Sequence, residues 1–319
     1  MTIARTDPAA PALLHHCRRY ADAHVGPEGA AQVSFPGLSV VRAMRPGELQ
    51  VAVQKPVIAM LLQGRKRVTT AGSSFEYAPG EAMVIAADIP TVSQVTRASP
   101  AAPYYSLVLD LSPAILKELS GLKELSGPQA GPPMVRAGQG GAGSIRVEPM
   151  APEVTDAALR LARLFDQPET LAVLGPGLVR ELHYWLLKGV HGPAIRAIGT
   201  VNSVAERIAR AVEILRRDYA RQIRVSELAD AAGMSEAAFH RQFRAITTLS
   251  PLQFQKQLRL IEARRLMLSR GDRIAQAAYA VGYASVPQFT REYGRFFKVS
   301  PGQDRRLEAG EMSLRRGSA

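Results

Sequence analysis

Residues 33–111 contain short runs of β-branched and aromatic residues that are separated by Gly- and Pro-rich turn signals. Many short strands at even spacing predict an antiparallel β-sandwich or barrel. The predicted strands are Val33–Phe35, Ser39–Val41, Leu49–Val53, Val57–Leu62, Arg67–Thr70, Ser74–Tyr77, Ala82–Ala86, Thr91–Thr96 and Tyr104–Leu111.

Helical signals follow the strand region. A helix is expected to begin at Ser112, because Pro113 suits a first turn, and two more are expected at about 153–166 and 176–189. Between them, residues 126–143 contain nine Gly or Pro and predict a flexible loop. The 176–189 helix carries an apolar stripe that fits either packing on the sandwich or a homodimer interface. Its members are Leu178, Leu182, Trp185 and Leu186.

From Ser203 onward the apolar periodicity is helical, and serines open several segments in the manner of a capping box. Such frequent helix starts predict a compact domain of many helices. The boxes are Ser203–Glu206, Ser250–Gln253, Ser285–Gln288 and Ser300–Gln303.

This C-terminal region repeats itself with a period of about fifty residues. A short helix, a glycine, a capping serine and a second helix occur twice, and the glycine suits a sharp turn with positive φ. A helix over 251–269, about 27 Å long at ~1.5 Å per residue, is expected to join the copies. The matching pairs are Gly233 and Gly282, Phe239 and Phe289, Arg241 and Arg291, Phe243 and Tyr293, and Pro251 and Pro301.

Each copy has helix-turn-helix form, in which the second helix enters the major groove of DNA. Two such helices on one chain fit two successive grooves, which lie about 34 Å apart on one DNA face. The alternative is a set of helical repeats that bind another protein.

Charge supports the nucleic-acid interpretation. The net charge is +12, of which residues 1–200 hold +3 and residues 201–319 hold +9. A basic excess concentrated in the helical third favours an acidic polymer, with nucleic acid ahead of a membrane surface.

Other classes of protein are disfavoured by what the chain lacks. One cysteine, Cys17, excludes internal disulfides and multi-thiolate zinc sites, and it is expected to be half-buried on an N-terminal helix. No histidine lies between His24 and His183, so the strands lack the ligands of a metal-dependent cupin enzyme. His15 and His16 lie outside the strands and are expected at the surface. A carboxylate-only metal site would need Glu76, Glu81 and Asp88.

The glycine-rich stretch at Gly138–Gly143 lacks the context of a phosphate-binding loop. A DNA-repair methyl acceptor would need activated cysteines, and a non-specific architectural DNA binder would not need a sandwich domain. We therefore expect no enzyme, cofactor or metal, no membrane span or signal segment, and a reducing, cytoplasmic setting.

The C-terminal residues resemble the AraC/XylS family of bacterial transcriptional regulators. The match lies in Ile274–Ser285, Gln288–Tyr293 and Phe296–Pro301, with Leu258–Leu266 similar to the family's linker helix. The N-terminal part resembles the AraC-type N-terminal domain through Leu61–Val68, Phe75–Gly80 and Gln94–Pro100.

The resemblance implies an α+β protein with a cupin-like N-terminal sandwich or barrel, flanked by helices, and an all-α domain with two helix-turn-helix units. The expected divisions are a sensor and dimerisation domain at 1–195, a linker at 196–203, a DNA-binding domain at 204–306 and a basic tail at 307–319.

The resemblance also implies side chains that read DNA. Arg pairs bidentately with guanine and Gln with adenine, whereas small apolar side chains touch the thymine methyl. Base readers are expected at Ala237, His240 and Arg241 and at Val286, Gln288, Thr290 and Arg291. His240 has phosphate contact as an alternative. Phosphate contacts are expected at Arg244, Arg295 and Lys298.

The expected function is sequence-specific regulation of transcription, with activation favoured over repression by family analogy. The expected partners are double-stranded DNA, RNA polymerase, a small-molecule effector of unknown identity and, as one interpretation of the stripe, a second copy of the chain. The aromatics Phe75, Tyr77, Tyr104 and Tyr105 fit the lining of an effector pocket, and core packing explains them equally well.

Overall fold

The computed structural model describes residues 9–26, 29–47, 50–70, 73–122, 145–199 and 203–306. The chain divides into two compact units, residues 1–50 with 54–206 and residues 51–53 with 207–319. The predicted glycine-rich loop at 126–143 and the predicted basic tail at 307–319 lie outside the described residues.

Two antiparallel sheets form the strand region of the first unit. One sheet has the order β1-β2-β9-β4-β7-β10 and the other has the order β3-β8-β5-β6. The strands are β1 (Ala30–Gln32), β2 (Leu38–Ala43), β3 (Gln50–Gln54), β4 (Val57–Gln63), β5 (Arg65–Thr70), β6 (Ser73–Tyr77), β7 (Glu81–Ile85), β8 (Ile89–Arg97), β9 (Tyr104–Asp110) and β10 (Ile145–Pro149).

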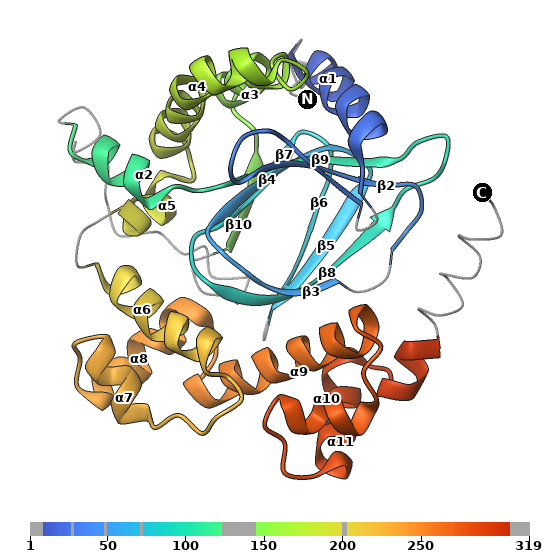
Figure 1. The fold of residues 1–319 in the computed structure, drawn as a ribbon. Coiled ribbons are helices and arrows are strands. Elements are labelled where there is room, and N and C mark those ends of the chain that lie inside the picture. The colour runs from blue at the N-terminus through green and yellow to red at the C-terminus, as the bar shows by residue number, and fades with distance from the viewer. Residues whose placement is uncertain are drawn as a thin grey trace, which may run out of the picture. The chain divides into compact units, whose positions relative to one another are not determined.

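Helices cover one face of the larger sheet, as Figure 1 shows for α1, α3 and α4. Alternate residues of β4 and β9, such as Ile58, Met60 and Leu107, join the helices in one buried apolar cluster. The other alternate residues, such as Leu61 and Tyr104, are also buried. Because both faces are covered, the central strands read as nearly continuous apolar runs. The helices are α1 (Ala9–His24), α2 (Pro113–Ser120), α3 (Pro152–Ala162), α4 (Pro168–Lys188) and α5 (Gly192–Gly199).

Most of the predicted strands are confirmed within one to three residues at each end, but Val33–Phe35 is wrong. The strand is Ala30–Gln32, and it pairs with β2 up to Gln32 opposite Ser39. Residues 33–37 are needed to turn the chain, with Gly37 at a φ of +74°. The sequence also gave no sign of β10, which pairs with β7 along the sheet edge.

The helical part of the first unit departs from the predictions in three places. The helix predicted to start at 176 begins at Pro168, and Pro176 lies on its exposed side, where the lost hydrogen bond is tolerable. Helix α5 occupies the first half of the predicted linker at 196–203. Cys17 is fully buried rather than half-buried, and burial raises the pKa of its thiol. The start at Ser112 is confirmed, since its side chain caps α2.

The apolar stripe of the 176–189 helix packs inside the first unit. Leu182 and Leu186 are about 0% and 1% exposed, and Leu178 and Trp185 pack against the same cluster. These leucines therefore cannot provide a surface for a second copy of the chain. The large apolar side chains that this helix exposes are Val173 and Leu174.

The second unit is helical, with two short-helix and long-helix pairs on either side of α9 (Figure 1). The nineteen residues of α9 confirm the predicted joining helix, and Ser250 opens it with a complete capping box. The helices are α6 (Val204–Arg217), α7 (Val225–Ala231), α8 (Glu236–Thr247), α9 (Pro251–Ser269), α10 (Ile274–Ala280) and α11 (Val286–Phe297).

A buried ion pair closes the end of this unit. Arg264 on α9 donates to both carboxylate oxygens of Asp304, at 2.8 and 3.0 Å, and the Tyr293 hydroxyl also donates to this carboxylate. Burial alone would raise the pKa of Asp304, but these bonds outweigh it and lower the pKa. The pair therefore ties the segment after α11 to α9.

The two recognition-type helices end in the same strained way. Thr248 follows α8 with a φ of +66°, and Lys298 follows α11 with a φ of +65°. This left-handed conformation disfavours side chains, above all β-branched ones. The Thr248 hydroxyl is also buried without a hydrogen-bond partner in the described part of the chain.

Replacing Thr248 with glycine is expected to stabilise the second unit by about 1 kcal/mol, because glycine adopts positive φ without strain. Thermal unfolding of the full chain, followed by far-UV circular dichroism, measures the effect. Lys298→Gly is the matched control, with the same φ but an exposed side chain. It should stabilise less, because it removes no buried hydroxyl. A loss of stability in Thr248→Gly would contradict the strain at this position.

Candidate nucleic-acid interface

Both repeat copies fold as a short helix, a tight turn and a longer helix. Gly233 and Gly282 occupy the turns with φ of +61° and +87°, which confirms the predicted need for glycine. Ser235 and Ser285 cap α8 and α11 by accepting hydrogen bonds from backbone N–H groups three residues later. The predicted turn and cap chemistry is therefore present in both copies.

The buried face of each longer helix fixes which residues point outward. Phe239 and Phe243 on α8, and Phe289 and Tyr293 on α11, are each about 0% exposed. Their spacing of four residues places them on one helix face. The opposite face of α8 presents Ala237, His240, Arg241 and Arg244, all exposed.

The outward face of α11 differs from that of α8. Thr290, Arg291 and Arg295 are exposed, as is Lys298 just after the helix. Val286 is half-buried and packs against the apolar cluster below it. Gln288 is also half-buried, and its side-chain amide donates to Glu292 Oε1 at 3.2 Å.

Glu292 anchors a polar network that the sequence analysis missed. Its carboxylate accepts hydrogen bonds from the Tyr283 hydroxyl at 2.9 Å and from Lys256 Nζ at 3.2 Å. Burial pushes the pKa of Glu292 up, but these bonds and that of Gln288 outweigh it and hold the pKa below its ordinary value. The network orients Gln288 and neutralises the only acidic side chain of α11. The sequence signal was a glutamate four residues after Gln288.

The exposed arginines of the two helices are free to meet an anion. In the ranges that the structure describes, Arg241, Arg244, Arg291 and Arg295 form no ion pair with a carboxylate. Other arginines of this unit are neutralised, as Arg221 is by Asp218 and Glu227. The outward faces of α8 and α11 therefore carry positive charge that is not balanced by an ion pair in the described residues.

Arg259 on α9 holds the two copies together. Its guanidinium donates to the Tyr219 carbonyl at 2.7 Å, which belongs to the first copy's side, and to the Gly282 carbonyl at 3.0 Å in the second turn. It also donates to the carbonyls of Ala220 and Arg221, at 3.2 and 3.1 Å. Burial lowers the pKa of Arg259.

Two further contacts reinforce this connection, which we call the Arg259 clamp. The Gln255 side chain donates to the Tyr219 and Arg221 carbonyls at 3.0 and 2.7 Å. A Cβ on Gly282 would overlap the carbonyl of Ala220, so this glycine also permits close approach between the two halves. The clamp thereby ties the segment between α6 and α7, on the side of the first copy, to the turn before α11 in the second copy.

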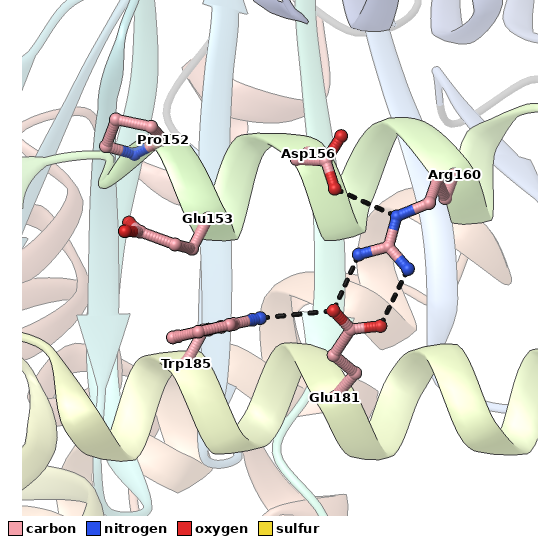
Figure 2. A pocket seen from close by; sticks show the side chains of 6 residues that line it. All are labelled: Pro152, Glu153, Asp156, Arg160, Glu181 and Trp185. Carbon is pink, nitrogen blue, oxygen red and sulfur yellow. Dashed lines mark hydrogen bonds and ion pairs between the residues drawn. The ribbon is translucent and has the colours of Figure 1, made fainter.

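A surface pocket of the first unit lies between α3 and α4, with a volume of about 320 Å³ (Figure 2). Arg160 makes two hydrogen bonds to Glu181, at 2.8 and 2.6 Å, and one to Asp156 at 2.9 Å. The Trp185 indole donates to Glu181 at 3.2 Å. The charged and polar groups of this pocket form hydrogen bonds with one another. Their role is therefore to hold α3 against α4, and they do not indicate a ligand site.

The four candidate pocket aromatics do not share one environment. Tyr105 joins the cluster beneath the helices and donates to Asp22 at 2.6 Å. Tyr77 and Tyr104 are buried outside that cluster, at 2% and 1% exposure, and Phe75 is half-buried. Tyr105 is thus a core residue of the helical side.

The described residues contain no group of three or more His, Cys, Asp or Glu side chains arranged to hold a metal ion. The ring nitrogens of His183 are engaged with the Val179 carbonyl and the Ser112 N–H. Within the same residues, no helix is both long and apolar enough to cross a membrane.

Parts of the chain are similar in sequence to known transcriptional regulators. A relative named HTH-type transcriptional activator RhaS, from Pectobacterium carotovorum, is 29% identical over 87 residues, which are 27% of this chain and 31% of that protein. A putative AraC-like transcription regulator from Streptomyces lividans is 30% identical over 138 residues, or 43% of this chain and 44% of the relative. The chain thus matches less than half of the length of these curated relatives.

The fold is similar to that of ToxT from Vibrio cholerae. A crystal structure of its apo form aligns with a TM-score of 0.51 at 12% identity, covering 86% of this chain and 98% of that one. At this identity the likeness concerns the fold alone.

Two family models match the chain. The model described as a helix-turn-helix domain matches residues 228–307, which include both copies of the repeat from Leu228 onward. The model described as the AraC-type transcriptional regulator N-terminus matches residues 34–194, about half of the chain. The chain belongs to the family of AraC-type transcriptional regulators.

Proposed function

We propose that this protein regulates transcription by binding a bipartite DNA site with α8 and α11, under the control of a small molecule bound by the first unit. The observation that carries the proposal is the pair of exposed arginine-bearing helices held by the Arg259 clamp. Helices placed in this way suit two successive major grooves.

Side chains on these helices divide by their chemistry. Arg241 and Arg291 lie midway along the outward faces, where a guanidinium can pair bidentately with guanine. Ala237, Val286 and Thr290 would contact thymine methyls or base edges, and Gln288 would face adenine after leaving Glu292. Arg244, Arg295 and Lys298 lie nearer the helix ends, where they would contact phosphates. His240 is assigned to either group.

Small-molecule control is supported by the two-unit organisation and by the relatives. ToxT, whose fold is similar, has a crystal structure described as bound to an unsaturated fatty acid. RhaS is named an activator, so activation, which involves contact with RNA polymerase in the cytoplasm, is favoured over repression. Dimerisation would have to use other residues than the buried leucines of α4.

Selection of duplexes from random DNA, at about 150 mM salt, tests the proposal and the division of roles. The full-length protein should select two blocks about ten base pairs apart. Arg291→Ala should lose sequence preference in one block, at a cost of ~1–3 kcal/mol on the selected site. Lys298→Ala should select the same motif and bind every duplex more weakly. Failure to select any motif, with or without candidate effectors, would refute sequence-specific binding.

The Arg259 clamp predicts a strict spacing between the two blocks. Arg259→Lys keeps the charge but cannot reach several carbonyls at once, so we expect on the order of tenfold weaker binding to the selected site. Inserting base pairs between the blocks should then weaken the variant less than the parent. Arg265→Lys, on the exposed side of the same helix, is the matched control. An unchanged dependence on spacing in Arg259→Lys would contradict the clamp.

A further inference from the structure

Strand register identifies the side chains that line the interior between the two sheets of the first unit. On β5, Val68 and Thr70 are buried and Arg67 is exposed, so alternate residues point inward. On β6, Tyr77 is buried and Glu76 is exposed. Glu76 bonds on the outer face to Arg67 and Thr96 and is not available inside.

Lys66 is the charged residue on this inward face. It lies directly opposite Tyr77 of β6 and Val95 of β8, both buried. Directly paired residues in an antiparallel sheet point to the same side. The Lys66 side chain therefore points between the sheets, although the residue retains some exposed surface.

Hydroxyl groups from both sheets lie in this interior, those of Thr70 and Ser93 among them. The Tyr77 and Tyr104 phenols lie within hydrogen-bonding reach of each other, one from each sheet. Ser106 follows two residues after Tyr104 on the same face of β9 and is 1% exposed. Its hydroxyl is near the Tyr104 phenol but makes no hydrogen bond of proper geometry within the described residues.

In the part of the chain that the structure describes, the Lys66 ammonium forms no ion pair, and burial alone lowers its pKa to about 8. The Glu81 carboxylate, on β7, accepts a hydrogen bond from a backbone N–H and forms no ion pair with Lys66. A buried cation without an anionic partner is unfavourable. The facing sheet contributes the apolar side chains of Leu61 on β4, directly opposite Ser106, and of Met83 on β7, both buried outside the cluster beneath the helices.

We propose that Lys66, Tyr77 and Tyr104 bind the carboxylate of a small monoanionic ligand whose apolar body lies between the sheets. One ammonium balances one negative charge, and phenol O–H groups donate to a carboxylate. A single lysine without an arginine fork fits a monocarboxylate better than a phosphate. The inference rests on the proposed control by a small molecule and gives that effector a chemical class.

The test uses the full chain and a panel of aliphatic and aromatic monocarboxylates, each paired with the alcohol of the same carbon skeleton. A carboxylate from the panel should raise the midpoint of thermal unfolding, and its alcohol should not. Lys66→Met, which keeps the stem of the side chain, should weaken carboxylate binding by about tenfold or more. Tyr77→Phe should weaken it about fivefold.

A matched variant separates this site from general charge effects. Lys117→Met removes an exposed lysine of α2 in the same unit and should leave carboxylate binding unchanged. Without ligand, Lys66→Met should unfold at or above the temperature of the parent, because it removes an unpaired buried charge. A less stable Lys66→Met variant would show that the ammonium has a structural role and would overturn the proposal.

Carboxylate binding at parental affinity in Lys66→Met would also overturn the site. The site would also be overturned if no carboxylate raised the unfolding midpoint of the parent protein. If the same preparation still selected a DNA motif, the proposed DNA-binding function would be unaffected. A carboxylate that binds through Lys66 without altering DNA binding would instead confirm the site and refute its role as an effector site.

Discussion

The relative placement of α8 and α11 depends on the hydrogen bonds of one partly buried arginine. Arg259 reaches backbone carbonyls on both sides of α9, one between α6 and α7 and one in the turn between α10 and α11, so neither segment can shift without breaking its bond. A guanidinium suits this position because its fixed fork of donors serves several acceptors at once. Gln255 repeats the same contacts one turn earlier, so the connection does not depend on a single bond.

Backbone geometry also explains why glycine occupies the turns of the two copies. Gly282 must be a glycine both for its positive φ and for its contact with Ala220, whereas Gly233 faces only the side chain of Arg207. The two copies are therefore alike in their caps and buried aromatics but unlike at their turns. Only the turn of the second copy, at Gly282, closely approaches backbone of the first half of the domain, at Ala220.

In the first unit, the two faces of the larger sheet bury side chains of different polarity. The helices bury an almost purely apolar face, with the Tyr105 hydroxyl satisfied by Asp22. The opposite face of this sheet carries Tyr104 and the hydroxyl of Ser106, which is unsatisfied among the described residues, and the facing strand β5 of the other sheet carries Lys66. The two faces of this sheet therefore differ in polarity, although apolar side chains are buried on the second face as well, among them Leu61 and Met83.

Local patterns were sufficient to predict much of this architecture. The repeat at fifty residues predicted both helix-turn-helix units and α9, because capping serines, turn glycines and core aromatics act within a few residues. The start of α4 at Pro168 was missed because the apolar stripe that predicted this helix begins only at Leu178 and because Pro176 lies inside the helix. β10 was missed because a five-residue edge strand has little pattern of its own and depends on β7 for its hydrogen bonds.

The candidate site was predictable only in part. Helical periodicity was sufficient to predict that the arginines of α8 and α11 point outward. Their contacts with DNA remain predictions. The Glu292 network and the Arg259 clamp include bonds between residues far apart in the chain, 36 positions from Lys256 to Glu292 and 40 from Arg259 to Tyr219. Such bonds depend on tertiary packing and have no local signature. Lys66 was likewise hidden, because its inward direction follows from strand register rather than from its residue type.

Hydroxyl-radical footprinting of the full-length protein on its selected duplex tests the central claim most directly, since it reports which faces of the DNA the bound helices cover. If α8 and α11 are held as one rigid pair, two protected patches should lie about ten base pairs apart on the same face of the duplex. A single protected patch, or two patches on opposite faces, would contradict the account.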